Sequence, residues 1–144
     1  MRIVVDTSVV FAGLHSRRGA AHAVLRGCLT GRWTPVVTVP LATEYEDVML
    51  RPELRRGSGL TRVDLDEFLD GFLASADLVE VFFLWRPNLR DEGDNFVLEA
   101  AVAGSASAIV TYNVKDFLGG GLKFDSIHII TPARLLLAGE GEFR

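Results

Sequence analysis

The feature that most constrains the fold is a series of short apolar runs separated by helical patterns. Each run is continuous rather than alternating, which is typical of strands that are buried on both faces. Strands that alternate with helices predict a parallel sheet covered by helices on both sides. The expected strands are Arg2–Asp6, Val36–Val39, Leu78–Leu84, Ala108–Thr111 and Ile127–Ile130.

Helices are expected between these runs, and several carry start or stop signals. Pro40 suits the first turn of a helix, Pro52 ends that helix, and Thr61 can cap the next one. Residues 53–60 are basic and contain glycine, and we expect them to form a connection. The expected helices are Val9–Leu14, Ala20–Leu29, Pro40–Arg51, Arg62–Leu73, Asp91–Ala103 and Pro132–Leu137.

Length and composition indicate one domain with one core over residues 1–144. Apolar residues make up 49% of the chain, which excludes a disordered protein. No apolar run approaches the roughly 20 residues that span a bilayer. The residues before Asp6 do not form the apolar region of a signal peptide, and the single Cys28 permits no intrachain disulfide. Both observations favour a reducing, cytoplasmic location.

Four acidic residues follow or feed the expected strands. Asp6 closes the first strand, Glu44 lies five residues after the second, and Asp116 lies five residues after Thr111. Ligands of an open parallel sheet bind beyond the carboxyl ends of its strands, so these three carboxylates are expected at one rim. Asp94 opens the helix that leads into the fourth strand, and the pattern alone does not fix its end of the sheet.

Each carboxylate also has a simple structural explanation. Asp6 can cap the following helix, Glu44 can be a solvated helix residue, and Asp116 can cap a turn. Asp91 and Asp94 can be the cap and the third residue of one helix. Carboxylates gathered at one rim repel one another unless a cation holds them, and oxygen ligands suit Mg²⁺ or Mn²⁺. The sequence therefore indicates a metal site at this rim.

Two further observations bear on the chemistry of such a site. The three histidines, His15, His22 and His128, are scattered, which argues against zinc. The net charge is −4, with 19 acids against 15 Lys and Arg, so the chain lacks a strongly basic footprint. If four acids bind metal, the other 15 balance the 15 bases, and a nucleic-acid substrate remains compatible with the acidic chain.

Four segments resemble the PIN domain, the nuclease fold of VapC-type toxins in toxin–antitoxin pairs. The segments are IVVDTSVVFAGL, VPLATEYEDVMLRPEL, RDEGDNFVLEAAVAGSASAIVTYNVKDF and IITPARLL. The resemblance implies a three-layer α/β/α fold whose five-stranded parallel sheet has the order 3-2-1-4-5. It also implies a metal-dependent ribonuclease that cuts single-stranded RNA, a cognate antitoxin protein, and a homodimer or higher homo-oligomer.

The resemblance implies that Asp6, Glu44, Asp94 and Asp116 bind Mg²⁺ or Mn²⁺ and carry catalysis. Asp94 is preferred over Asp91 because its spacing of 22 residues to Asp116 is closer to that of the family. Asp91 is then expected to cap the helix. Asn113 stands where some relatives carry an acid, which leaves less charge for a second ion. Thr7, Ser8 and Thr111 offer hydroxyl groups that can support the site or cap helices.

The implied reaction is attack of water on phosphorus, which gives 5′-phosphate and 3′-hydroxyl ends. Substrate contacts are expected from arginine and lysine near the rim, although each is equally explained as solvated surface charge. These candidates are Arg17, Arg18, Arg51, Arg55, Arg56 and Lys115. Phosphotransfer onto Asp6 is disfavoured, because a dehalogenase-like phosphatase needs a second Asp where this chain has Ser8. The other alternative is a PIN-fold module that binds RNA or protein without cutting.

Overall fold

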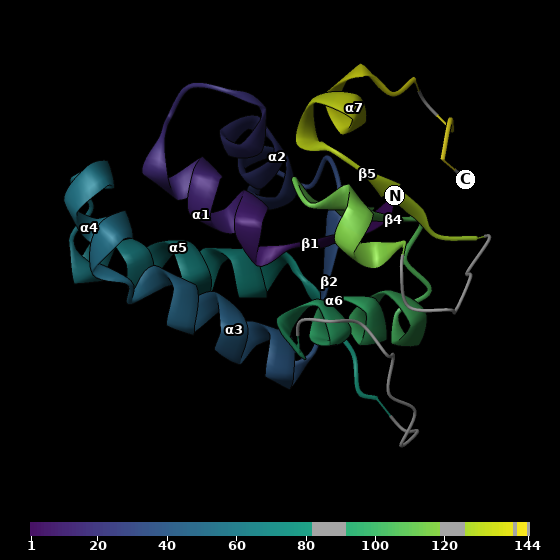
Figure 1. The fold of residues 1–144 in the computed structure, drawn as a ribbon, viewed down its shortest axis with the longest axis horizontal. Helices are drawn as coiled ribbons and strands as arrows, with labels where there is room; N and C mark the ends of the chain where they lie inside the picture. Colours follow the sequence, from purple (N-terminus) through teal and green to yellow (C-terminus); the bar gives the residue numbers. More distant parts are fainter. Residues whose placement is uncertain (82–91, 119–125, 140, 144) are drawn as a thin grey trace.

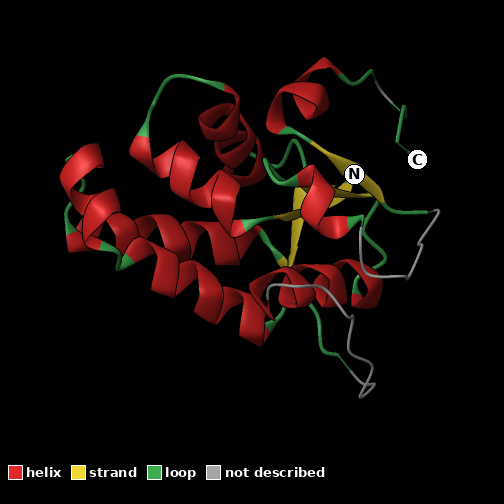
Figure 2. Ribbon diagram, in the orientation of Figure 1, coloured by secondary structure: helices red, strands yellow, loops and turns green. Residues whose placement is uncertain are grey.

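A computed structural model describes residues 1–81, 92–118, 126–139 and 141–143. Its centre is a five-stranded parallel sheet of order β3-β2-β1-β4-β5, shown in yellow in Figure 2. The sheet order, the parallel strands and the α/β class confirm the prediction. The strands are β1 (Arg2–Val5), β2 (Thr34–Val37), β3 (Asp77–Leu78), β4 (Ala108–Val110) and β5 (His128–Ile130).

The helices alternate with the strands as expected. Those before β3 are α1 (Thr7–His15), α2 (Ala20–Leu29), α3 (Val39–Met49), α4 (Pro52–Ser58) and α5 (Arg62–Ser75). Those after it are α6 (Glu92–Ala103), the short 3₁₀ helix η1 (Val114–Phe117) and α7 (Pro132–Leu137). In the described part of the chain, no helix is long and apolar enough to cross a membrane.

Helices cover both faces of the sheet (Figure 1). In this view α3 and α6 lie below the strands, and α6 contacts β1, β2 and β4. Helices α1 and α2 pack against each other above the strands, with α7 next to α2. Helix α5 runs beside α3 and reaches β2 and α2, while α4 lies at the far end of α3, against α1. The carboxyl end of β1 leads directly into α1, which also contacts α3.

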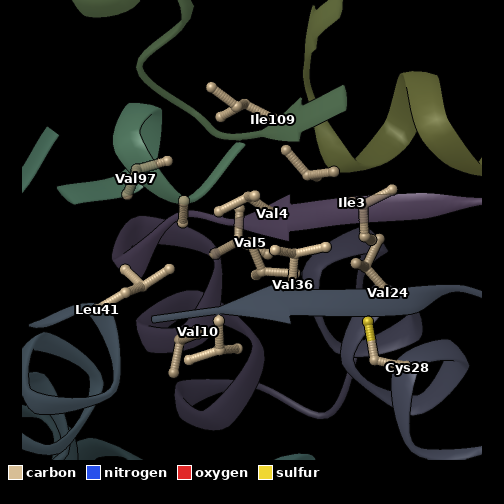
Figure 3. Close-up of a cluster of buried hydrophobic side chains, with 14 of the residues drawn as sticks. Ile3, Val4, Val5, Val10, Val24, Cys28, Val36, Leu41, Val97 and Ile109 are labelled. Atoms are coloured by element: carbon tan, nitrogen blue, oxygen red, sulfur yellow. The ribbon is translucent and has the colours of Figure 1, made fainter. Parts of the chain in front are cut away.

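The core forms around β1, the central strand, which pairs with β2 on one side and β4 on the other. The side chains of Ile3, Val4 and Val5 are completely buried. Figure 3 shows them among apolar side chains from the neighbouring strands and helices, including Cys28 of α2. Burial raises the pKa of the Cys28 thiol to about 12, so this cysteine is protonated and acts as a small apolar core group.

Most predicted bounds differ from the structure by one or two residues, and three elements differ more in extent or type. The second strand is Thr34–Val37 rather than Val36–Val39, because Val39 already belongs to α3, and it contains Pro35, which is tolerated near the start of a strand. The expected connection at residues 53–60 is mostly helix α4, because Pro52 starts a helix as well as ending one, and Leu54 is completely buried. The third strand is limited to Asp77–Leu78, and residues 82–84 of its predicted extent lie outside the described residues.

Other local signals were read correctly. Thr61 caps α5, and a reciprocal capping box joins its hydroxyl to the backbone of Asp64 and the Asp64 carboxylate to the backbone of Thr61. Helices α2 and α7 have the predicted bounds. In both segments the apolar spacing and the residues at the helix ends indicate the same bounds. The local sequence is therefore sufficient to predict these two helices.

Candidate active site

A cavity of about 380 Å³ opens beyond the carboxyl ends of β1 and β4. Its wall combines the start of α1, the end of α3, the start of α6 and the 3₁₀ helix η1. The lining residues are Asp6, Thr7, Ser8, Phe11, Val48, Arg51, Asp94, Asn113 and Asp116. Three of the four predicted carboxylates therefore face one space, although 110 positions separate the first from the last.

Asp6 is the most deeply placed of these carboxylates, with only 2% of its surface exposed. It occupies the N-cap position of α1, yet its side chain makes no capping hydrogen bond. Instead, Asp6 Oδ2 accepts hydrogen bonds from Ser8 Oγ and Thr111 Oγ1, each at 2.7 Å. Asp6 Oδ1 accepts no hydrogen bond from the described residues. The carboxylate is thus held by one oxygen, while the other is available to a ligand in the cavity.

The two hydroxyl groups that hold Asp6 join β1 and β4 at their carboxyl ends. Thr111 is completely buried, and its Oγ1 also accepts a hydrogen bond from the Asn113 backbone N–H at 2.9 Å. Ser8 Oγ accepts a longer bond, 3.3 Å, from the backbone N–H of Tyr112. The Ser8 hydroxyl therefore holds Asp6 and also ties the turn after β4 to the start of α1. Neither hydroxyl group caps its own helix, which was the competing explanation for Ser8.

Tyr45 supports the same end of β1 from the other direction. Its ring is fully buried, and its hydroxyl donates a hydrogen bond of 2.6 Å to the carbonyl oxygen of Val5, the residue before Asp6. Burial, and secondly the negative charge of Asp6, raises the pKa of Tyr45 well above its usual value. Tyr45 consequently stays protonated and keeps donating to Val5 at any ordinary pH.

The remaining predicted ligands occupy different positions around the cavity. Asp94 lines it from the first turns of α6, and Asp116 lines it from η1, where its side chain is exposed. Glu44 is half-buried on α3 and is not part of the lining. Val48, one helical turn later, does line the cavity. Glu44 therefore lies on the same side of α3 as a lining residue. Asp91 lies outside the described residues.

The donors that face the cavity are of the kind that a hard divalent cation prefers, since they are carboxylate oxygens supplemented by an amide and hydroxyl groups. Asp6 Oδ1 is oriented and unpartnered among the described residues. However, no three His, Cys, Asp or Glu side chains within the described ranges lie close enough together to form a ready metal site. The residue types fit a metal, but the carboxylates surround the cavity rather than converging at one point.

The predicted substrate-binding cations divide into two groups. Arg51, between α3 and α4, lines the cavity directly. Arg17 and Arg18 lie in the exposed loop between α1 and α2, Arg55 and Arg56 lie on α4, and Lys115 is exposed on η1; none of these five residues lines the cavity. Asn113 and Thr7 do line it, whereas Thr111 lies beneath it as the anchor of Asp6.

Sequence reasoning missed three contributors to this region. Phe11 and Val48 form its apolar wall, and Tyr45 fixes the end of β1. Phe11 and Val48 have the ordinary spacing of core residues in their helices, so nothing in the pattern distinguishes them. Tyr45 directly follows Glu44, and a phenol on the buried face of a helix needs a hydrogen-bond partner. This requirement is the sequence feature from which a structural role of Tyr45 could have been predicted.

Comparison with known proteins agrees with this architecture. The family model described as "PIN domain" matches residues 2–115, most of the chain. The chain therefore belongs to the PIN domain family, whose members are generally nucleases that depend on divalent metal ions.

One similar solved structure is the crystal structure of VapBC2 from Rickettsia felis bound to a DNA fragment from their promoter. The matching chain is 14% identical with a TM-score of 0.54, and the match covers 91% of this chain and 98% of that one. At this identity the likeness concerns the fold alone. No match was found among curated proteins.

Proposed function

We propose that this protein is a divalent-metal-dependent endoribonuclease that cuts single-stranded RNA. The observation that carries the proposal is the cavity beyond β1 and β4, where Asp6, Asp94 and Asp116 meet from three separate elements. Carboxylates that face one space repel one another, so their placement around this cavity favours a bound cation. PIN domain membership supports a nuclease for this arrangement.

In this proposal Asp6 and Asp116 would hold the better-bound Mg²⁺ or Mn²⁺ ion, and Asp94 and Glu44 would complete the site. When bound, such ions lower the pKa of a coordinated water molecule and stabilise the leaving 3′ oxygen. Ser8 and Thr111 keep Asp6 in one orientation through Oδ2, which leaves Oδ1 without a hydrogen bond from the described residues. Arg51 lines the same cavity and is placed to hold a phosphate group of the RNA.

We further propose that the protein acts in the cytoplasm as the toxin of a toxin–antitoxin pair. The similar fold in VapBC2 supports this proposal, since VapBC2 is a toxin–antitoxin complex. A cognate antitoxin would then cover the cavity, and a homodimer or higher homo-oligomer is the expected assembly. Co-expression with the product of a neighbouring small gene, followed by co-purification and loss of RNA cleavage, tests the pairing.

Incubation of the purified protein with single-stranded RNA tests the nuclease directly. We expect cleavage in Mn²⁺ or Mg²⁺ and none in EDTA, because the proposed nucleophile is a metal-activated water. The products should carry 5′-phosphate and 3′-hydroxyl ends. Products ending in 2′,3′-cyclic phosphate would show instead that the RNA's own 2′-hydroxyl attacks, and would overturn the metal-water reaction.

A second candidate function is a PIN-fold module that binds RNA or protein without cutting it. It is favoured by the absence, within the described ranges, of three acidic side chains close enough for a ready metal site. Protein that binds RNA but leaves it intact in Mn²⁺ and in Mg²⁺ would establish this alternative.

Thr111→Val is expected to reduce RNA cleavage by about 10- to 100-fold, because it removes one of the two hydroxyl donors that orient Asp6. The shape of the buried side chain is kept, so the effect should appear mainly in kcat. Thr111→Ser retains the donor and serves as the matched control. Equal activity of the valine and serine variants would show that the hydroxyl has no positioning role.

A further inference from the structure

A second cavity lies directly beside the first, on the other side of the corner between α3 and α4. Its volume is about 430 Å³. Leu50 and Pro52 line this second cavity, whereas Arg51, the residue between them, lines the carboxylate cavity. Its lining residues are Leu50, Pro52, Arg55, Arg56, Gly59, Leu60 and Thr61. The two cavities are therefore adjacent, and the corner residue Arg51 separates them.

The second cavity combines cations with apolar surface. Arg55 and Arg56 supply two guanidinium groups, and neither forms a salt bridge within the described residues. Leu50, Pro52 and Leu60 supply the apolar part of the wall. An unpaired guanidinium beside apolar surface suits a nucleotide, because arginine binds phosphate and the apolar wall can take a base.

The backbone at the end of α4 brings this wall together. Gly59 has a φ of 72°, the left-handed conformation in which glycine ends a helix without steric cost. The chain turns back there, so that Leu60 and Thr61 line the same cavity as Arg55 and Arg56. The turn at Gly59 thus fixes which residues line the second cavity together with the two arginines.

The local charge contrasts with that of the whole chain. Residues 51–62 contain four arginines and one acid, Glu53, in a protein of net charge −4. Arg62 is paired with Asp66, but Arg51, Arg55 and Arg56 have no such partner among the described residues. Glu53 does not line either cavity.

The other acid near this corner is already engaged. Asp64 is bonded to Thr61, and these bonds, with a smaller contribution from the charge of Arg17, lower its pKa. His15, at the end of α1, lies against Gly57 of α4.

We propose that the cavity formed by Arg55, Arg56 and the turn at Gly59 binds a nucleotide of the single-stranded RNA outside the scissile position, with the guanidinium groups on its phosphate. This inference rests on the proposed function, since it makes the second cavity a substrate subsite beside the carboxylates. The RNA passes from one cavity to the other across Arg51. The subsite contributes to binding of longer RNA and takes no part in the bond cleavage.

Binding of a fluorescent RNA of about 12 nucleotides, measured by anisotropy in EDTA, tests the subsite without cleavage. Arg55→Gln/Arg56→Gln should raise the Kd about 10- to 100-fold and reduce the slope of log K against log salt by roughly 0.7, the value for one phosphate that is no longer neutralised. Arg55→Lys/Arg56→Lys keeps the charge and should retain most of the binding. The matched control is Arg26→Gln/Arg32→Gln, which removes two exposed arginines that line neither cavity.

Cleavage assays separate the subsite from the active site. The Arg55→Gln/Arg56→Gln variant should raise the KM for the long RNA by a larger factor than the KM for a dinucleotide in Mn²⁺. Unchanged RNA binding by this variant in EDTA would overturn the subsite and leave an acidic protein segment as the occupant of the cavity. RNA binding that depends on Arg55 and Arg56 without any cleavage in Mn²⁺ would confirm the contact with RNA while contradicting the proposed nuclease.

Discussion

Asp6→Asn is expected to lower metal-dependent cleavage of single-stranded RNA by at least about 100-fold, more than the loss of a residue that only orients a ligand. Asn keeps an oxygen that can accept the hydrogen bonds of Ser8 and Thr111, so the position of the side chain should be preserved. The variant lacks the negative charge of the group facing the cavity. Initial rates of RNA cleavage in Mn²⁺, at saturating and at low RNA, measure the effect on kcat and on kcat/KM.

Asp70→Asn provides the matched control for this experiment. Asp70 is an exposed acid on α5 that does not line the cavity, so its substitution removes the same charge without altering the proposed site. Circular dichroism and thermal unfolding of both variants establish that they are folded. Comparable loss of activity in the two variants would indicate a general effect of net charge and would contradict a specific role for Asp6.

Phe72→Ala is expected to lower the free energy of unfolding by about 3–5 kcal/mol. Phe72 is completely buried, and its ring lies nearly perpendicular to the Tyr45 ring with the centroids 5.6 Å apart. Truncation removes this packing and leaves a cavity beside Tyr45, whose hydroxyl donates a hydrogen bond to the carbonyl oxygen of Val5. Urea denaturation measures the change as a shift of the midpoint at constant slope.

Phe68→Ala is the comparison for Phe72. Phe68 lies one turn earlier on α5 with its ring 5.6 Å from that of Phe72, but it is only half-buried and makes no ring contact with Tyr45 within the described part of the chain. Its truncation should cost clearly less, because part of its surface is already in water. A cost for Phe68→Ala equal to that for Phe72→Ala would show that the Tyr45 contact is not a main support of this region.

Local sequence predicted much of the fold because its signals are short-range. Thr61 and Asp64 form their capping box within one turn, and Ala20–Leu29 carries its own apolar face. Helix α4 was missed because its charged, glycine-containing sequence resembles a loop. Its stability comes from burial of Leu54, which depends on how α4 packs against α1 and α3.

The candidate site was predictable to the extent that topology determines it. Asp6 and Asp116 follow neighbouring parallel strands, so the rim they share follows from the strand order. Asp94 was assigned through its spacing in the family, since the start of a helix does not reveal which end of the sheet it faces. The bond from Thr111 to Asp6 depends on side-chain directions across 105 positions of sequence, and no local pattern contains that information.

In the proposed function, carboxylates at the N-cap of α1, on α6 and on η1 hold one divalent cation together. Titration of the purified protein with Mn²⁺, with the free ion followed by electron paramagnetic resonance, tests it most directly. The wild-type protein should bind Mn²⁺, and Asp6→Asn, Asp94→Asn and Asp116→Asn should each weaken that binding by at least about tenfold, while Asp70→Asn leaves it unchanged. Binding that is absent from the wild-type protein, or equal in all four variants, would contradict the account.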